Sequence, residues 1–220
     1  MKNTKAIIFD AYGTLFDVNS AAKKCKDKIG DKWESFANYW RTTQLEYTWL
    51  RSLMKRHKDF WQVTQDSLDK AMKAFNIDNS MRNELLDLYK ILLPFPEVEN
   101  TLKKLKQKKY KLAILSNGTP QLLNELVKSS SLENLFDDIF SVEQAKIYKP
   151  NSKVYDIPVN EYQIQKNEIV FLSANTWDVS GAGNYGYRAV WVNRNNNIFD
   201  NLDYVPKYQV ENLSKLIDIV

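Results

Sequence analysis

Residues 6–17 of the chain read Ala-Ile-Ile-Phe-Asp-Ala-Tyr-Gly-Thr-Leu-Phe-Asp. The apolar run 6–9 has the length of a buried strand, Asp10 comes directly after it, and Gly13 marks a turn. The stretch therefore predicts a strand with an acid at its carboxyl end. A single aspartate in such a place is more often a turn or capping residue than a nucleophile, so its role depends on the residues at the ends of the other strands.

Similar apolar runs recur at 112–115, 139–142, 169–172 and 189–192. Apolar residues at helical spacing lie between the later runs, as at 122–127. Strands that alternate with helices predict an α/β fold, here a Rossmann-like parallel sheet with helices on both faces. Ligands bind beyond the carboxyl ends of the strands in such sheets, so the catalytic residues are expected at that edge.

Residues 18–93 interrupt this alternation, because their apolar residues are spaced as on amphipathic helices. These residues are Trp33, Phe36, Tyr39, Trp40, Leu45, Trp49, Leu50, Leu53, Leu68, Met72, Leu85, Leu86 and Leu88. The prolines of Leu93-Pro94-Phe95-Pro96 then end the block. We expect an all-helical cap, 18–93, inserted into a core domain made of 1–17 and 94–220.

The composition is that of an ordinary globular protein. A length of 220 residues suits one domain, or one domain with an insertion, and 44% hydrophobic with 26% charged residues argues against a disordered or fibrous chain. The only cysteine, Cys25, cannot form an internal disulfide, which favours a reducing cytoplasm. The run 6–9 is too short for a signal peptide or a membrane span, so no membrane partner is expected.

Lysines cluster between residues 103 and 111, although the net charge of the chain is only +4. They are Lys103, Lys104, Lys106, Lys108, Lys109 and Lys111. Leu102 and Leu105 are interleaved with them at helical spacing, which is typical of a solvated helix face rather than of a nucleic-acid site. No nucleic-acid partner is therefore expected.

Polar residues also come after the other predicted strands. The second run ends in Ser116-Asn117-Gly118, the third is followed by Tyr148-Lys149-Pro150, and the fourth continues as Ser173-Ala174-Asn175-Thr176-Trp177-Asp178. Because the carboxyl ends of parallel strands meet at one edge, hydroxyls, amides, one ammonium and two carboxylates are expected together there.

The order and content of these four motifs resemble the haloacid dehalogenase superfamily over essentially the whole chain. Most of its members are phosphatases, with a second aspartate two positions after the nucleophile and acidic magnesium ligands in the fourth motif. This chain departs at both places, with Tyr12 at the first and Ser173, Ala174 and Asn175 ahead of Asp178 at the second.

These departures have a chemical interpretation. A leaving alkoxide must be protonated, whereas halide is the conjugate base of a strong acid and leaves without a general acid. Neutral Ser173 and Asn175 make a poor magnesium site, since magnesium prefers carboxylate oxygens. The chain is most similar to the L-2-haloacid dehalogenases, and the resemblance implies hydrolysis of short (S)-2-haloalkanoic acids to (R)-2-hydroxy acids and halide, with no metal and no cofactor.

The resemblance implies that Asp10 is the nucleophile and forms an ester, with Thr14 holding its carboxylate by a hydroxyl hydrogen bond. Lys149, at a predicted helix start, is expected to keep Asp10 ionised, and Tyr155 matches the family tyrosine that supports this lysine. From the residues alone, Thr14 could equally be a turn former and Tyr155 a half-buried aromatic.

Hydrolysis of the ester is assigned, by the same resemblance, to Ser173, Asn175 and Asp178. They position and activate the water, and Asp178 is either the base or the residue that positions it. A helix-capping role for Asp178 at the start of the helix 178–185 is the alternative.

The resemblance also implies how the substrate is held. Arg41 and Asn117 cradle the departing halide, Phe60 forms an aromatic wall, and Ser116 binds the carboxylate together with N–H groups at the helix start near Pro120. The remaining substrate-binding residues are Ala11, Tyr12, Leu45 and Trp177. The plain alternatives are a surface arginine, core packing of Phe60 and a helix cap at Ser116.

Two other functions stay open from the residues. One is a magnesium-dependent phosphatase of the same fold, and the other is a catalytically silent protein that binds through the lysine cluster. The expected partners are a 2-haloalkanoate and halide ion, and a homodimer is possible because relatives of this type are commonly dimers.

Overall fold

The structure is a computed structural model, and it describes residues 1 and 3–220. Its centre is a six-stranded parallel sheet with the strand order β3-β2-β1-β4-β5-β6. The strands are β1 (Ala6–Phe9), β2 (Lys111–Ser116), β3 (Asp138–Ser141), β4 (Ile169–Ser173), β5 (Arg188–Val192) and β6 (Tyr208–Val210). The predicted α/β fold is confirmed, and β6 is the strand that the sequence pattern missed.

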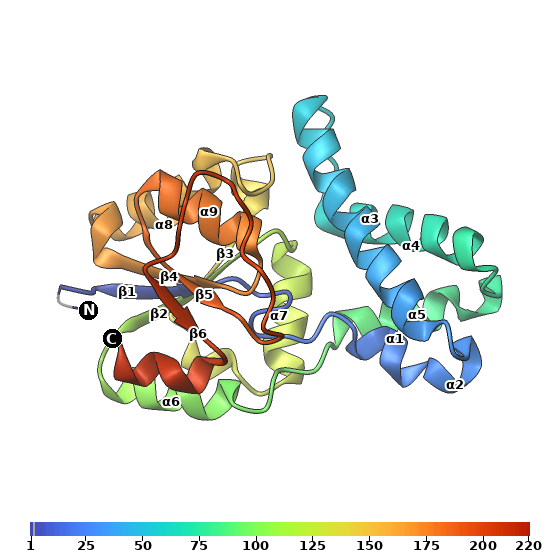
Figure 1. Ribbon diagram of the computed structural model, residues 1–220, viewed down its shortest axis with the longest axis horizontal. Helices are drawn as coiled ribbons and strands as arrows, with labels where there is room; N and C mark the ends of the chain where they lie inside the picture. The colour runs from blue at the N-terminus through green and yellow to red at the C-terminus, as the bar shows by residue number, and fades with distance from the viewer. Residues whose placement is uncertain (2) are drawn as a thin grey trace.

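The two central strands are fully buried because helices cover both faces of the sheet. Helices α8 and α9 lie on one face, and α6 lies on the other beside the C-terminal η5 (Figure 1). The core helices are α6 (Val98–Gln107), α7 (Pro120–Ser129), α8 (Ser152–Tyr162) and α9 (Thr176–Tyr185), with short 3-10 turns at η2 (Glu133–Leu135), η3 (Val142–Gln144), η4 (Lys166–Glu168) and η5 (Leu213–Asp218).

Between β1 and α6 the described chain is helical, as the spacing of its apolar residues predicts. The cap helices are α1 (Ser20–Lys24), α2 (Lys26–Ile29), α3 (Trp33–Leu53), α4 (Phe60–Phe75), η1 (Asn79–Met81) and α5 (Arg82–Lys90). They lie to one side of the sheet (Figure 1). Two adjacent segments join them to the core, held together by the bridge between Phe16 and Pro94 and by a hydrogen bond from Asp17 N to Leu93 O.

The strand register brings the polar motifs to one edge. Phe9, the last residue of β1, pairs with Ile114 of β2 on one side and with Leu172 of β4 on the other. The residues that come after each strand therefore leave the sheet at the same level. Asp10 stands between the segments that begin at Ser116 and Ser173, where the topology places a ligand site.

The lysine cluster lies on the solvent side of α6 and just beyond it, with Leu102 and Leu105 buried beneath. Lys103 pairs with Glu99 at 2.6 Å, and Lys106 pairs with Asp137 at 2.6 Å. Part of the positive charge is therefore already neutralised within the chain. Among the described residues, no helix combines the length and apolar character needed to cross a membrane.

Candidate active site

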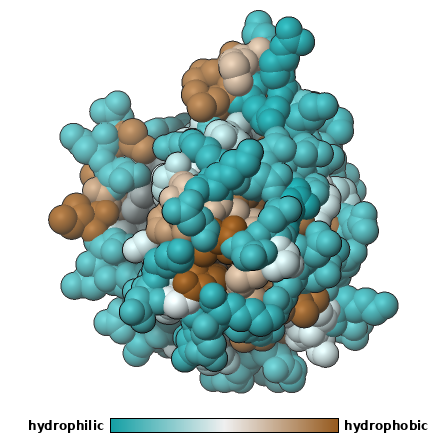
Figure 2. Space-filling view, turned by 90° about the vertical axis from the view of Figure 1, so that its right-hand side faces the viewer, coloured by the Kyte–Doolittle hydropathy of each residue, from teal (hydrophilic) through white to brown (hydrophobic). Residues whose placement is uncertain are grey.

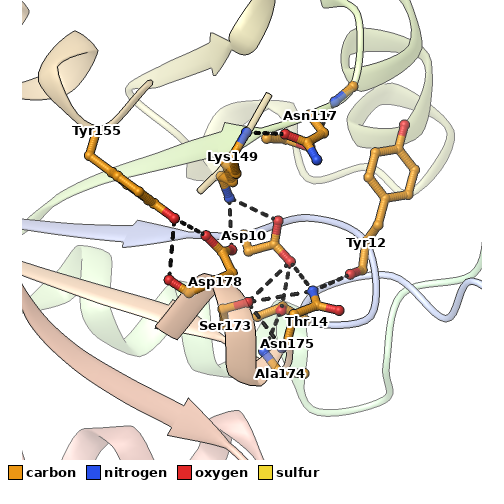
Figure 3. Close-up of polar contacts among 12 residues, drawn as sticks. Asp10, Tyr12, Thr14, Asn117, Lys149, Tyr155, Ser173, Ala174, Asn175 and Asp178 are labelled. Atoms are coloured by element: carbon orange, nitrogen blue, oxygen red, sulfur yellow. Dashed lines mark hydrogen bonds and ion pairs between the residues drawn. The ribbon is translucent and has the colours of Figure 1, made fainter. Parts of the chain in front are cut away.

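The Asp10 carboxylate is buried and enclosed by four donors, which come from the loop after β1, the end of β4 and the segment that contains Lys149 (Figure 3). Its Oδ2 accepts hydrogen bonds from the Thr14 hydroxyl at 3.1 Å, the Asn175 amide at 2.9 Å and the Ser173 hydroxyl at 3.4 Å. Its Oδ1 lies 3.1 Å from Nζ of Lys149. These contacts fix the carboxylate in one orientation, which is what a nucleophile in a displacement needs.

The loop after β1 aims Asp10 by means of a tight turn. Three backbone N–H groups, including those of Thr14 and Leu15, donate to the carbonyl of Ala11, and Gly13 takes a φ of +87°, which favours glycine. The Thr14 hydroxyl also accepts from Ala174 N at 2.8 Å, which ties the loop to β4. Thr14 is therefore more than a turn former. The side chain of Ala11, next to Asp10, is fully buried.

Lys149 joins two buried carboxylates. Its Nζ lies 3.1 Å from Asp10 Oδ1 and 2.9 Å from Asp178 Oδ2, and its backbone N donates to Asn117 Oδ1 at 3.2 Å. Burial lowers the pKa of Lys149, but the two carboxylate charges outweigh burial and leave its pKa raised. The expectation that Lys149 stands at a helix start is wrong: Asn151 caps α8, which begins two residues after Pro150.

Asp178 is completely buried and is the third residue of α9, in the first turn of the helix. The N-cap of α9 is Asn175, so the capping role considered for Asp178 is wrong. Burial raises the pKa of Asp178 to about 6, against the opposing charge of Lys149. The Tyr155 hydroxyl donates to Asp178 Oδ1 at 2.7 Å, so Tyr155 supports Lys149 through Asp178 rather than directly.

The halide-binding residues of the cap and core were expected around Arg41. Arg41 lies half-buried on α3, and its Nη1 donates to Oε1 of Gln44 at 2.8 Å. Phe60 begins α4, is fully buried and packs 5.2 Å from the ring of Tyr12. The packing role considered for Phe60 is thus present.

Tyr12 carries a buried hydroxyl with no hydrogen-bond partner in the part of the chain that the structure describes. Its ring stacks 5.7 Å from Tyr89 and points away from Asp178 (Figure 3). Burial and the charge of Tyr89 raise the pKa of Tyr12, while the charge of Arg41 acts to lower it. Arg41 therefore stands within electrostatic range of this hydroxyl.

Ser116 ends β2 beside the start of α7. Its hydroxyl accepts from Gly118 N at 3.1 Å, whereas Thr119 caps α7 and Pro120 takes the first helical position, as predicted. Ser116 is therefore not the cap of this helix. Ser116 lies fully buried at the end of β2.

Trp177 and Leu45 are half-buried, Trp177 on α9 and Leu45 on α3. Trp177 packs edge to face against Trp49 of α3, with 5.4 Å between ring centroids, so the core and the cap meet here. A cavity of about 380 Å³ opens beside this contact and is lined by Trp49, Tyr148 and Lys149 among others.

Sequence reasoning missed a buried polar group beside Arg41. Gln44 is 1% exposed, and its amide reaches Thr64 and Tyr89. Its position three residues after Arg41 places the two side chains together on a helix, so helical spacing was the available signal. It also missed Arg194, whose Nη2 donates to the backbone oxygen of Thr14 at 2.8 Å and for which the sequence held no signal.

The donor chemistry at the strand ends differs from that of the phosphatases. Tyr12 and Asn175 contribute a phenol and an amide where those enzymes place carboxylates, and the Asn175 amide donates to Asp10. Among residues 1 and 3–220, no group of three His, Cys, Asp or Glu side chains is placed to hold a metal ion.

Comparison with known proteins places the chain in a family. Residues 4–186 match the family described as haloacid dehalogenase-like hydrolase. The chain belongs to the haloacid dehalogenase-like hydrolases. An (S)-2-haloacid dehalogenase of Pseudomonas sp. (strain YL) is 38% identical over 221 residues, which cover 100% of this chain and 95% of that protein.

Two solved structures extend this similarity. A crystal structure of a dehalogenase is 37% identical, covers 100% of this chain and 98% of its own, and superposes with a TM-score of 0.97. The L-2-haloacid dehalogenase from Xanthobacter autotrophicus with chloropropionic acid covalently bound is 31% identical over 98% of both chains, with a TM-score of 0.92. The resemblance to L-2-haloacid dehalogenases is therefore confirmed.

Proposed function

We propose that the protein is a hydrolytic dehalogenase that converts short (S)-2-haloalkanoic acids into (R)-2-hydroxy acids and halide through an ester on Asp10. Full-length similarity to (S)-2-haloacid dehalogenases supports this activity. The observation that carries it is the fixed carboxylate of Asp10, held on one oxygen by neutral donors and on the other by Lys149. Neutral Ser173 and Asn175 suit a reaction that needs no metal-bound phosphate.

In the first step one Asp10 oxygen attacks C2 of the substrate from the side opposite the halogen. A C–O bond forms, the carbon–halogen bond breaks with its electron pair, and the configuration at C2 inverts. The halide leaves toward Arg41 and Asn117, with Phe60 as the apolar wall, while Ser116 and the N–H groups at the start of α7 hold the carboxylate. Tyr12, Leu45 and Trp177 line the space for the alkyl group, beside the buried Ala11.

In the second step water attacks the ester carbonyl carbon of Asp10. We assign the proton from this water to Asp178, because a buried carboxyl whose pKa lies at about 6 is ionised at neutral pH yet basic enough to accept it. Ser173 and Asn175 position the water and the ester oxygen, and Tyr155 and Lys149 keep Asp178 in place. The bond between the carbonyl carbon and the product oxygen then breaks, the product oxygen takes the proton from Asp178 to become the hydroxyl of the 2-hydroxy acid, and the Asp10 carboxyl loses its own proton to solvent, which regenerates the carboxylate.

A single turnover in heavy-oxygen water tests the proposal. The new hydroxyl oxygen comes from Asp10 if the ester forms, so 2-hydroxypropionate made from 2-chloropropionate with enzyme in excess is expected to be unlabelled. Mass spectrometry should then find the label in the peptide that contains Asp10. Label in the first product and none in the peptide would mean direct attack by water and would remove Asp10 as the nucleophile.

Residues 18–93 are proposed to act as a cap subdomain on a core made of 1–17 and 94–220. The proposed location is the cytoplasm, which the lone buried Cys25 favours.

We also propose a homodimer. In the view onto the cap side, apolar groups gather at the top of a mostly hydrophilic surface (Figure 2). The end of α3 exposes Leu53 by 79% and Met54 by 60%, which supports a contact there. Light scattering of wild type and Leu53→Glu tests it.

A further inference from the structure

A buried hydrogen-bond network lies behind Arg41 and joins three cap helices. Gln44 of α3 donates from Nε2 to Thr64 Oγ1 of α4 at 2.7 Å and to the Tyr89 hydroxyl of α5 at 3.0 Å. Thr64 in turn donates to the carbonyl of Phe60 at 2.7 Å. Gln44 is 1% exposed and Thr64 and Tyr89 are buried as well, so water does not compete for these bonds.

The orientation of the Gln44 amide follows from the chemistry of its neighbours. Arg41 has only donors, so the group that faces it at 2.8 Å must be the amide oxygen. The amide nitrogen then points to Thr64 and Tyr89, which both offer oxygens. The Gln44 amide oxygen thus faces the Arg41 guanidinium, and its NH₂ group donates to side chains on α4 and α5. Because both ends of the amide have partners, rotation of the amide would break these hydrogen bonds.

The same network also contacts the loop that follows Asp10. The Tyr89 ring stacks on Tyr12, which lies two residues after Asp10 and packs on Phe60. Burial raises the pKa of Tyr89 and the charge of Arg41 opposes this rise, so Arg41 acts on both tyrosines. The position of the guanidinium is therefore set relative to the wall of the pocket.

We propose that Gln44 is a positioning residue for the leaving halide: its amide oxygen directs the Arg41 guanidinium toward the halogen, and its neutrality leaves the positive charge available to the departing anion. This inference rests on the proposed role of Arg41 in halide release. A carboxylate at the same place would hold the guanidinium as firmly but would cancel its charge. A hydrophobic side chain would leave the charge intact but undirected.

Two substitutions separate these effects. Gln44→Glu keeps an acceptor and adds a negative charge, whereas Gln44→Met removes the acceptor and adds none. Gln62→Glu is the matched control, because it is the same chemical change at an exposed position of α4 whose side chain contacts Asp66 and is outside the network. Halide release is measured from 2-chloropropionate and 2-bromopropionate, together with product inhibition by sodium bromide at constant ionic strength and the melting temperature.

Both Gln44 variants are expected to lose turnover with the chloro substrate more than with the bromo substrate, because chloride is the poorer leaving group and depends more on the directed charge. Inhibition by bromide should weaken about tenfold, the change in affinity that a loss of about 1.4 kcal/mol of binding free energy gives. Gln62→Glu should change neither quantity. A purely structural role would lower the melting temperature and both rates alike. An unchanged ratio of the two rates and unchanged bromide inhibition would overturn the proposal while leaving dehalogenation intact.

Failure of the proposed function gives a different result. Wild-type protein would then release no halide from either substrate. Direct titration of the protein with sodium bromide in a calorimeter still decides the role of Gln44 in that case. Bromide binding that is lost in Gln44→Glu would support the anion site, and absence of binding in wild type would overturn it.

Discussion

Replacing Lys149 by methionine should cost both stability and turnover, because it removes the only cation in contact with two buried carboxylates among the residues described here. Lys149 Nζ lies 3.1 Å from Asp10 and 2.9 Å from Asp178, with all three side chains almost completely buried. Methionine has a similar length and no charge, so the change tests the charge rather than the volume.

The magnitude can be worked out from these distances. At about 3 Å and an effective dielectric constant of about 20, each ion pair contributes roughly 5 kcal/mol of attraction, which the desolvation of the ammonium largely offsets. Removing one partner of a buried pair costs about 3–5 kcal/mol, because the remaining charge stays buried. Domains unfold with about 5–15 kcal/mol, so Lys149→Met should lose about a fifth or more of the total stability.

Urea denaturation at pH 8 and pH 5 is the assay for the stability loss. Burial already raises the pKa of Asp178 to about 6, and without the opposing charge of Lys149 it rises further. A carboxyl with a raised pKa stabilises the fold at low pH and loses this contribution as the pH rises, so the variant should be closer to wild type at pH 5. Halide release should fall at least about a hundredfold.

Lys146→Met is the matched control, because Lys146 is 69% exposed and pairs only with Glu143 in the contacts described, a pair worth about 0–1 kcal/mol. The double variant Lys149→Met with Asp178→Asn removes one of the stranded carboxylates and should recover part of the lost stability. If Lys149→Met loses no more than Lys146→Met and keeps its turnover, the buried ion cluster is not what organises this site.

Three further outcomes are expected. Asp178→Asn should be nearly inactive. The free energy of unfolding of wild type minus that of the variant should fall as the pH rises from about 4 to about 6, because the folded Asp178 carboxyl keeps its proton up to about pH 6. Parallel pH curves for the two proteins would contradict a raised pKa of Asp178. Arg41→Ala should reduce turnover at least about a hundredfold with little change in melting temperature, whereas a loss of melting temperature alone would make Arg41 structural. Turnover of 2-chloropropionate should be the same with EDTA or added magnesium, since Ser173 and Asn175 bring no carboxylate, and efficient magnesium-dependent phosphatase activity would overturn the substrate class.

The sequence predicted the core of the fold because five of its strands are short, buried apolar runs that need no tertiary information to be seen. The sixth strand, β6, is only three residues long and half exposed, so its sequence carries no comparable pattern. The all-helical character of the cap was also predictable from spacing. The start of α8 was not predictable in the same way. Proline favours the first position of a helix, so Pro150 indicates a start there, whereas in the structure Asn151 caps the helix.

The strand-end residues of the site could be predicted, since parallel strands deliver Asp10, Ser116 and Ser173 to one edge whatever the side chains between them. Contacts that depend on distant packing could not. Tyr155 and Asp178 are 23 residues apart, and only the packing of α8 against α9 shows that the tyrosine reaches the carboxylate instead of Lys149. The roles of these residues in catalysis remain predictions.

The charge balance of the site gives a physical reason for the proposed role of Arg41. Asp10, Asp178 and Lys149 together carry one excess negative charge in a buried place, and a 2-haloalkanoate adds another. In the proposed mechanism Arg41 reduces this excess to one, so the substrate would meet less repulsion on binding. Displacement turns Asp10 into a neutral ester and creates a halide ion, which leaves the sum unchanged. Departure of the halide then makes the site neutral, and Asp178 is left as the one carboxylate of the cluster that can accept the proton of the attacking water.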